Sequence, residues 1–407
     1  MTRRQTVRPQ GTAWEVFCLF LTLGLTSFGG PVAHLGYFRD AVVTRRGWLG
    51  ERAYADLVAL CQFLPGPASS QVGMAIGLQR AGYAGMLAAW TAFTLPSAML
   101  LVAFAFGIGA FETKMGAEAG WVQGLKAAAV AVVAHAVLGM ARNLAPDKQR
   151  ATIAVGGMIV AMLMPTAVGQ VLAIAIGAAA GLLWLKPADA SADGADNVRV
   201  PVSRRAAFAC LAAFAVLLVV LPLWAATGDG VATMVDSYYR AGALVFGGGH
   251  VVLPLLQAEV VGPGLVDRDA FLAGYGAAQA VPGPLFTFAA FLGAVHQQGP
   301  SGLVGAVIAL LAIFLPSALL IVGTLPFWDR LRTAPNVRRA LMGVNAAVVG
   351  LLAAALYDPV FSQGIASAPA MAIAAAGFVA LTVWKAPAWA VVVVSGVVGA
   401  AVLGAGA

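Results

Sequence analysis

Residues 62–67 read QFLPGP, and residues 279–284 read QAVPGP. Each stretch lies within a long run of apolar residues that is otherwise suited to a helix. Proline removes a backbone donor and clashes with the preceding turn, and glycine permits dihedral angles that other residues avoid. Both stretches are therefore expected to break a helix, and we call residues 64–67 and 281–284 the first and the second break.

The composition decides the class of protein. Hydrophobic residues make up 61% of the 407 residues and charged residues 10%, and the mean hydropathy is +0.88. Soluble domains average about 45–50% apolar and about 25% charged residues, so most of this surface must face lipid. We predict an all-α polytopic membrane protein. Freed backbone groups in such a protein must face protein or water, which makes the two breaks candidate polar points.

Apolar windows of about 20 residues predict about thirteen transmembrane segments, some of them broken or re-entrant. These are residues 13–34, 53–80, 83–110, 121–142, 151–165, 167–185, 206–226, 232–256, 270–296, 301–326, 337–357, 366–384 and 387–406. A polar stretch, residues 186–205, reads as a hydrated linker. We therefore expect an N-terminal repeat at 1–185, a linker with one connecting span at 186–231, and a C-terminal repeat at 232–407.

Basic residues in the short loops predict the orientation. If the N-terminus is cytoplasmic and every segment crosses, most loop arginines and lysines fall inside and Asp229 and Asp358 fall outside, as the positive-inside rule requires. The C-terminus is then periplasmic. Residues 39–52 are an exception, because their four arginines would fall outside. Either this region folds back into the membrane or its arginines have a function, and the sequence leaves both open.

Three motifs recur in one register. Residues 27–31 (SFGGP) return at 245–249 (VFGGG), QFLPGP returns as QAVPGP, and LPSA at 95–98 returns at 315–318. The offsets are 246 − 28 = 218, 282 − 65 = 217 and 315 − 95 = 220. Six segments precede the linker and one connecting span follows it, so the second half starts on the opposite side from the first. An inverted repeat of this kind is typical of transporters that work by alternating access.

The breaks are the first candidate site. A helix that restarts after each Pro-Gly-Pro has an N-terminus with a partial positive charge inside the membrane, which suits an anion. Hydroxyl and amide groups follow the first break, and the glycine-rich stretches could let the backbone approach a ligand. The alternative is a kink and close helix packing without a ligand. The candidate substrate-binding residues are Gly29, Gly30, Pro31, Gln62, Pro65, Gly66, Pro67, Ser69, Ser70, Gln71, Gly247, Gly248, Gly249, His250, Gln279, Pro282, Gly283, Pro284 and Thr287.

Ionisable residues within apolar segments are costly and are often functional. The candidates for electrostatic or coupling roles are His34, Arg39, Arg46, Lys126 and His135. Histidine could carry a coupling proton, and arginine could attract an oxyanion with forked hydrogen bonds. Each has a plainer reading: a hydrogen-bonded structural histidine, a lysine that reaches the interface, or arginines that contact lipid headgroups.

No constellation typical of an enzyme is present in the sequence. It has no Gly-Lys-Ser/Thr phosphate loop, and its three cysteines lie far apart in apolar runs without metal-ligand spacing. We therefore expect no catalytic residues, no metal and no cofactor.

At the three repeated motifs, residues 28–31, 62–71 and 95–97 with their counterparts at 246–250, 282–284 and 315–317, the chain resembles the chromate ion transporter (CHR) family in its long two-domain form. Gly249 stands where the first half has Pro31. The resemblance implies a bacterial inner-membrane protein whose two homologous halves are inserted in opposite orientation. It further implies that the protein exports chromate, driven by the membrane potential or a proton gradient, and confers chromate resistance.

Alternatives to a chromate exporter stay open at this point. Sulfate has the same tetrahedral shape and charge as chromate, so a carrier for sulfate or another anion has the same features. An anion channel with paired half-helices is a further alternative. The expected partners are chromate or sulfate as the small-molecule substrate, the lipid bilayer, and a second copy of the chain in a homodimer. No nucleic acid is expected, because the basic residues are those of membrane loops.

Overall fold

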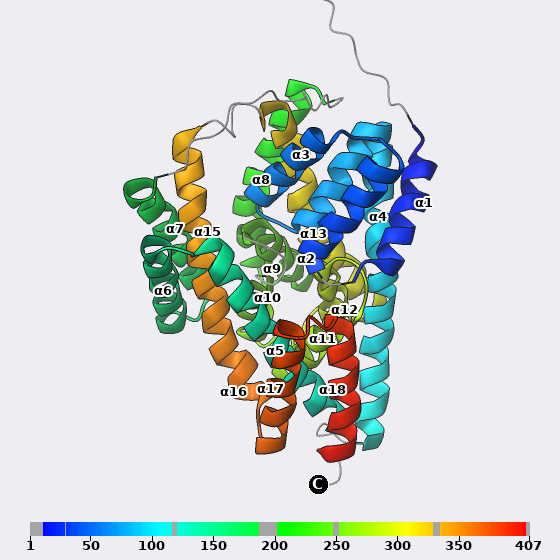
Figure 1. Cartoon of the computed structure of the whole chain (residues 1–407), viewed down its shortest axis with the longest axis vertical. Coiled ribbons are helices and arrows are strands. Elements are labelled where there is room, and N and C mark those ends of the chain that lie inside the picture. Colours follow the sequence, from blue (N-terminus) through cyan, green and yellow to red (C-terminus); the bar gives the residue numbers. More distant parts are fainter. Residues whose placement is uncertain are drawn as a thin grey trace, which may run out of the picture.

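The computed structural model describes residues 11–28, 30–115, 120–186, 202–246, 252–328 and 334–403, and every regular element in these ranges is helical. Figure 1 shows the helices. The longest are α4 (Ala68–Met115), α5 (Gly120–Leu144), α8 (Arg204–Ala225), α13 (Gly302–Thr324) and α15 (Pro335–Ala355). The first half adds α1 (Ala13–Thr26), α2 (Gly30–Arg39), η1 (Asp40–Arg45), α3 (Glu51–Phe63), α6 (Lys148–Leu163) and α7 (Ala167–Trp184). The second half adds α9 (Gly230–Leu244), α10 (Val252–Leu256), η3 (Gln257–Val261), α11 (Arg268–Ala280), η4 (Leu285–Thr287), α12 (Phe288–Ala294), η5 (Leu325–Phe327), η6 (Leu356–Phe361), α16 (Ser362–Gly364), α17 (Ala368–Thr382) and α18 (Ala388–Val402).

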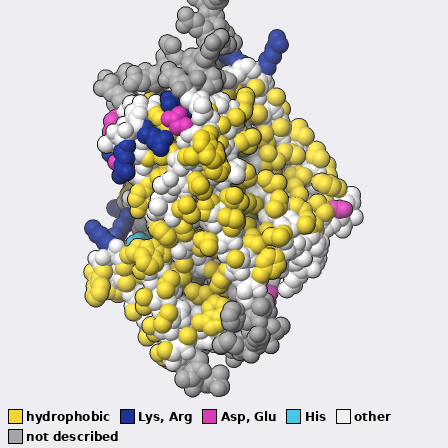
Figure 2. All heavy atoms as spheres, turned by 90° about the vertical axis from the view of Figure 1, so that its right-hand side faces the viewer, with side chains coloured by type: hydrophobic (Ala, Val, Ile, Leu, Met, Phe, Trp, Pro, Cys, Tyr) yellow, Lys and Arg dark blue, Asp and Glu magenta, His cyan; other side chains and the backbone are white. Residues whose placement is uncertain are grey.

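The surface confirms a membrane protein. Large apolar side chains are exposed along α6, α7, α8, α17 and α18. Figure 2 shows one face that is almost continuously hydrophobic, with most of its visible Lys and Arg side chains gathered near the upper end. A surface of this kind is stable only against lipid, because exposing apolar surface to water costs about 25 cal/mol of free energy for each square ångström.

Among the described residues, five helical stretches are long and apolar enough to cross a membrane. They are residues 68–107, 120–144, 204–225, 302–327 and 335–364. The first contains a kink at Ala81 and Gly82, which divides α4 into a short arm, residues 68–80, and a long arm, residues 83–115. The thirteen expected segments are all found as helices. Thirteen therefore counts apolar segments and not membrane crossings. The shorter segments need an explanation other than a plain crossing.

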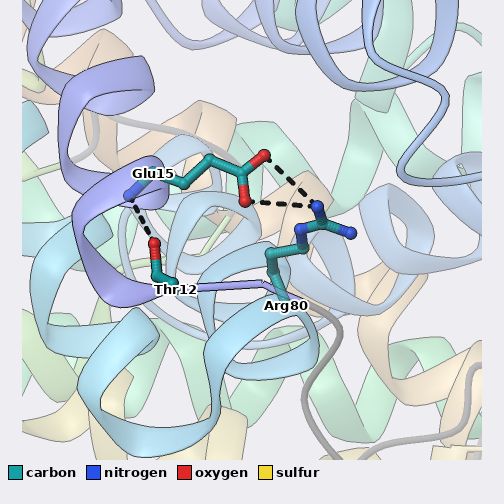
Figure 3. Close-up of polar contacts among 3 residues, drawn as sticks. All are labelled: Thr12, Glu15 and Arg80. Atoms are coloured by element: carbon teal, nitrogen blue, oxygen red, sulfur yellow. Dashed lines mark hydrogen bonds and ion pairs between the residues drawn. The ribbon is translucent and has the colours of Figure 1, made fainter.

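The short helices of the first half enter and return at the same end of the molecule. Glu15, in the first turn of α1, pairs with Arg80 at the end of the short arm of α4 (Figure 3). The guanidinium groups of Arg46 and Arg80 both lie over the ring of Trp48, at 5.1 and 4.8 Å from its centroid. Hence α1 with α2, and α3 with the short arm of α4, form two hairpins whose tips lie in the interior. Residues 39–52 connect these two hairpins at the same end as the start of α1, because the chain has already folded back within residues 13–39, so their arginines lie at the end where the first half begins.

The second half repeats these hairpins from the opposite end. Gly230, at the start of α9, lies against Gly299, and the backbone N–H of Gln297 bonds to the carbonyl of Leu265. The start of α9, the connection before α11 and the residues after α12 therefore meet at one end. The described end of α9 and start of α10, and the turn between α11 and α12, therefore lie toward the interior.

The long helices show that the halves are inverted. The long arm of α4 and α13 carry the same LPSA motif, so they are equivalent helices. Trp90 contacts Phe314, with ring centroids 5.7 Å apart, and Ala98 packs in one cluster with Ala306. At these contacts a higher residue number on α4 lies against a lower residue number on α13. The two equivalent helices are therefore antiparallel. The single long helix α8 connects the halves, which confirms the inverted repeat predicted from the sequence.

The last helices of each half pack on the other half. Helix α5 lies against α17 and α18, and α15 lies against α6 and α7. Close glycine contacts mark both interfaces: Gly124 abuts the backbone of Ser395, and Gly350 abuts the backbone of Ala154. In Figure 1, α1 lies beside the upper part of α4 and α18 beside its lower part. Phe28 and Trp389 meet between them, with ring centroids 5.9 Å apart. The turn between α17 and α18 therefore lies beside the tip of the α1–α2 hairpin.

The fold-back of residues 39–52 can be tested by cysteine accessibility. In a chain without its native cysteines, we expect Thr12→Cys and Thr44→Cys to react with a membrane-impermeant maleimide from the same face of the membrane. Gln298→Cys should react from the opposite face, because it lies at the outer end of an inverted hairpin. Labelling of positions 12 and 44 from opposite faces would contradict the hairpin and restore a plain crossing.

Candidate functional site

The two breaks are joined to the opposite half by reciprocal hydrogen bonds. The backbone N–H of Gly66, in the first break, donates to the carbonyl of Val245 at 2.6 Å. The backbone N–H of Gly283, in the second break, donates to the carbonyl of Ser27 at 3.0 Å. Ser27 and Val245 follow α1 and α9, just before the two glycine-rich stretches. Each break therefore contacts the residue that follows the first helix of the other half's hairpin, Val245 after α9 or Ser27 after α1.

The third repeated motif takes part in the same crossing. Ser317, from the second LPSA motif, lies beside Gly66 and accepts a hydrogen bond of 3.4 Å from the Gln71 side chain. Ser97, from the first LPSA motif, lies beside Gly283. Both glycines have a positive φ, 120° and 98°. A side chain at either position would be strained and would meet the serine of the other half, so glycine is required there.

A cavity of about 420 Å³ opens at this crossing. Its wall combines the N-terminal turn of α2 with α5, the second break and the turn between α17 and α18. Because a water takes up about 30 Å³, the cavity has room for a small ion with part of its hydration. We call it the first cavity. Its polar and helix-terminal lining residues are Gly30, Pro31, His34, His135, Gln279, Gly283, Thr382 and Lys385.

Two buried polar atoms of the first cavity lack a hydrogen-bond partner in the part of the chain that the structure describes. They are Nε2 of His34, from the first half, and Nε2 of Gln279, from the second. Nδ1 of His34 lies 3.4 Å from the Ser69 hydroxyl, so only the far side of the ring is unsatisfied. Buried polar groups are nearly always paired, and each exception calls for an explanation. Both residues line the first cavity, which makes them candidates to contact a polar ligand there.

The charge of the first cavity favours an anion. Lys385 lies on its wall, and no acidic side chain does among the residues described there. The His135 ring lies 3.1 Å from the Thr382 hydroxyl, which links α5 to the end of α17. The N-terminus of α2 adds the partial positive charge of a helix end at Gly30 and Pro31.

The predicted binding residues after the first break lie behind this cavity. Ser69, Ser70 and Gln71 are all buried, and Gln71 donates to the carbonyl of Pro65 at 2.6 Å. Ser69 reaches the cavity only through His34. The Ser70 hydroxyl and the Oε1 of Gln71 have no partner among the described residues. The prediction that these three contact the anion directly therefore stays a prediction, while Gly30, Pro31, His34, His135, Gln279 and Gly283 line the cavity itself.

Other predicted residues have local partners. Arg39 forms an ion pair with Glu51, and Lys126 forms one of 2.7 Å with Asp269. Thr287 is buried and donates to the carbonyl of Pro284 at 2.7 Å. Gln62 is exposed on α3. Pro67, like Pro65, flanks the first glycine, and Pro282 with Pro284 flanks the second. Gly29, Gly247, Gly248, Gly249 and His250 lie outside the described residues.

Lys385 is the residue that sequence reasoning placed elsewhere, in an inner loop. Its wall position follows from the contact of the α17–α18 turn with the tip of the α1–α2 hairpin, which the sequence does not show. One signal was available: Lys385 is the only charged residue after Asp358. A single charge within a long apolar stretch is a functional candidate by default.

A second cavity, of about 320 Å³, lies between the corresponding elements of the other half. It is lined by the turn between α6 and α7, by α10 and η3, and by α15 and η6. Gln170 reaches across it and donates to the carbonyl of Pro254 at 2.8 Å. Its charged lining residues are Arg268 and Asp358, one of each sign. The two cavities share equivalent long helices, α5 and α15, and equivalent turns, but no residue of the first break lines the second cavity, and the described lining favours an anion only in the first.

The sequence comparisons agree with this architecture. The family model for chromate transporters matches residues 14–182 and again 232–400. The chain belongs to the chromate transporter family. The two matches differ in register by 218 residues, the same offset as the glycine-rich motif.

Several named chromate transport proteins align with this chain over most of its length. The chromate transport protein of Pseudomonas aeruginosa is 30% identical over 94% of this chain and 90% of its own length. A probable chromate transport protein of Synechococcus elongatus is 27% identical over 86% of this chain and 85% of its own. The chromate transport protein of Cupriavidus metallidurans is 27% identical over 86% of this chain and 82% of its own. No solved structure matches the chain.

The crossing at the first break can be tested by substitution. Gly66→Ala should lower the free energy of unfolding by about 1–3 kcal/mol, because the new Cβ is strained at this φ and meets the Ser317 hydroxyl. Adding Ser317→Ala should recover the part due to the collision and leave the part due to strain. Thermal unfolding in detergent measures both. Gly36→Ala, where the space around the glycine is open, is the control, and an equal effect there would contradict the crossing.

Proposed function

We propose that this protein is a secondary transporter that exports chromate across the inner membrane of a bacterium and thereby confers chromate resistance. The family and the names of its relatives support chromate as the substrate. The observation that carries the proposal is the first cavity. It places a lysine, the N-terminus of α2 and two unsatisfied buried nitrogen atoms around one space, without an acidic side chain among the described residues of its wall.

The residues of the first cavity suit a tetrahedral dianion. Lys385 supplies a full positive charge, and the Gln279 amide offers a hydrogen-bond donor among the lining residues. The ring of His34 can donate from Nε2 when its other nitrogen accepts from Ser69. Four oxygens around one centre can be reached from several sides at once, which matches donors that come from both halves. An exporter must also release the ion, so donors on separate hairpins that can move apart are an advantage.

The inverted halves give the proposed route for export. The reciprocal bonds at Gly66 and Gly283 hold the four hairpin tips together at the centre, with one cavity related to each half. Alternating access would open the first cavity to one side and close it as the halves exchange conformations. We propose that the end carrying Glu15 and the fold-back arginines is cytoplasmic, because basic loops are retained there. The C-terminus is then periplasmic.

The membrane potential alone favours this direction. Moving one charge through 100 mV is worth about 2.3 kcal/mol, and a dianion doubles this value. An inside-negative potential therefore drives chromate outward. The protein needs only to provide a path and to prevent leakage of other ions.

The function is tested by uptake into everted membrane vesicles. Labelled chromate should accumulate in energised vesicles that contain the protein, the uptake should fall when the potential is collapsed, and it should stop when the potential and the pH gradient are both collapsed. Sulfate is measured in parallel. Accumulation of sulfate alone would make the protein a sulfate carrier, and flux that never exceeds the electrochemical equilibrium and does not saturate would make it a channel. No chromate accumulation with folded protein would contradict the proposal.

The site is tested by charge removal. Lys385→Gln should weaken chromate binding by about ten- to hundredfold, the value of a charge-assisted hydrogen bond. Gln279→Leu should weaken it less, because a neutral donor is lost. Affinity can be measured from the chromate dependence of initial uptake. Lys148→Gln, which removes an exposed lysine outside the first cavity, is the matched control, and equal affinity of the Lys385 and Lys148 variants would remove Lys385 from the site.

A further inference from the structure

Two buried carboxylates and a partly buried arginine form a charged group in the second half, away from the first cavity. Asp236 and Arg240 lie one turn apart on α9, and Glu259 lies on η3, in the returning arm of the same hairpin. Arg240 Nη2 is 2.5 Å from Asp236, and Arg240 Nε is 2.9 Å from Glu259. Asp236 and Glu259 are 4% and 5% exposed. We call these three residues the ion-pair triad.

The triad has an excess of negative charge. It contains two carboxylates and one guanidinium, so it carries one net negative charge when both carboxylates are ionised. An uncompensated buried charge is costly, and such a site lowers the cost by taking up a proton. The net charge of the triad therefore changes from minus one to zero when one proton binds.

Few other charged groups surround the triad. Helices α10 and α13 pack against α9 and carry no ionisable side chain in their described residues. The basic residues of α8, Arg204 and Arg205, are exposed at its first turn. On α11, which packs against η3, Arg268 faces the second cavity and Asp269 pairs with Lys126.

The remaining titratable neighbours are uncharged aromatic groups. The rings of Tyr238 on α9 and of His296 after α12 lie 6.5 Å apart. Tyr239 donates to the carbonyl of Phe214 on α8 at 3.0 Å. Tyr275 on α11 packs its ring on Phe288. None of these supplies the missing positive charge, apart from His296 if it is protonated.

The first half builds the same hairpin without these charges. In the second half, the N–H groups of residues 265 and 266 both bond to the carbonyl of Val260, and in the first half those of residues 48 and 49 both bond to the carbonyl of Val42. Glu259, which precedes Val260, thus corresponds to Ala41, which precedes Val42. At the offset of 218, Asp236 and Arg240 correspond to Cys18 and Thr22. The hairpin forms in the first half without the triad, so the presence of two buried carboxylates and a partly buried arginine in the second half needs another explanation.

The triad is mechanically linked to the first break. Arg240 ties the outgoing arm of the hairpin, α9, to its returning arm, η3. Helix α9 ends at Leu244, and the carbonyl of the next residue, Val245, accepts the hydrogen bond from Gly66. A change in the pairing of Arg240 can therefore move the tip that holds the first break. The matching tip of the first half has no ion pair of this kind among its described residues.

We propose that Asp236 and Glu259 form a proton-binding site that couples chromate export to proton entry. A proton from the outer side bonds to a carboxylate oxygen of Glu259, giving the neutral acid, and its ion pair with Arg240 is lost. The two arms of the hairpin are then released from each other, and the grip of the tip on the first break weakens. On return to the other state the proton leaves the carboxyl and the ion pair forms again. This proposal rests on the proposed transport function.

The experiment uses full-length protein in proteoliposomes, with the membrane potential held at zero. Wild-type protein should show chromate flux driven by a pH gradient, together with chromate-dependent proton movement reported by a trapped pH dye. Glu259→Gln should lower both by about tenfold or more, in the usual range of a coupling free energy. Exchange of labelled for unlabelled chromate at equal concentrations, which needs no net proton movement, should be retained.

Two further variants keep the test decisive. Glu15→Gln removes the carboxylate of another interhelical Arg–Glu pair, at the opposite end of the molecule, and should leave the pH response unchanged. The triple variant Asp236→Cys, Arg240→Thr, Glu259→Ala gives the second half the residues of the first and leaves no unpaired charge. It should fold, exchange chromate and ignore the pH gradient.

The outcomes separate the two proposals. Wild-type exchange without any response to the pH gradient, or a response that survives in Glu259→Gln and in the triple variant, would overturn the proton site alone. Absence of chromate exchange in wild-type protein would overturn the transport function. The proton site is then still decided by infrared difference spectra between acidic and alkaline buffer, where a carboxyl band should be present in wild-type protein and absent from Glu259→Gln. A band that is unchanged in the variant would overturn the site.

Discussion

The amide groups of Gly66 and Gly283 both find their acceptor in the opposite half of the chain. Inside a membrane an unpaired amide or carbonyl costs several kcal/mol, because no water is present to replace the lost partner. Each half creates two such groups where its hairpins turn and satisfies them with those of the other half. The meeting of the four hairpin tips, the position of the serines of the LPSA motifs and the place of the first cavity all follow from this exchange.

The residues that we propose to carry the function lie where the two halves of this scaffold differ. The turn between α17 and α18 carries Lys385 at the first cavity, and the corresponding turn between α6 and α7, residues 164–166, carries no charge. The second-half hairpin of α9 and η3 holds two buried carboxylates paired with Arg240, and its counterpart lacks all three charges. Each of these elements forms with the charges in one half and without them in the other. Packing of the element therefore does not require the charges. Comparison of the halves therefore separates residues that the fold needs from residues that an activity needs.

The sequence was sufficient for the membrane class, the duplicated halves and the two breaks, because all of these depend on local composition and on one constant offset. It could not choose between a crossing and a fold-back at residues 39–52, since a count of basic residues cannot tell a short hairpin from a span. It also centred the site on the residues next to each break, such as Ser69 and Gln71. The first cavity instead lies between halves, where α2 meets Gln279 and Lys385, and no sequence spacing reveals which hairpin tips meet.

The exchange of hydrogen bonds also has an evolutionary consequence. A polypeptide that contains only one half would bury a glycine amide and a carbonyl that it cannot join to each other. It could be stable only beside a second half inserted the opposite way, supplied by another chain or by a duplicated gene. Fusion of two such genes requires a linker that crosses the membrane an odd number of times. Helix α8 meets that requirement with a single crossing. This is the smallest insertion that preserves the hydrogen bonds between the two halves.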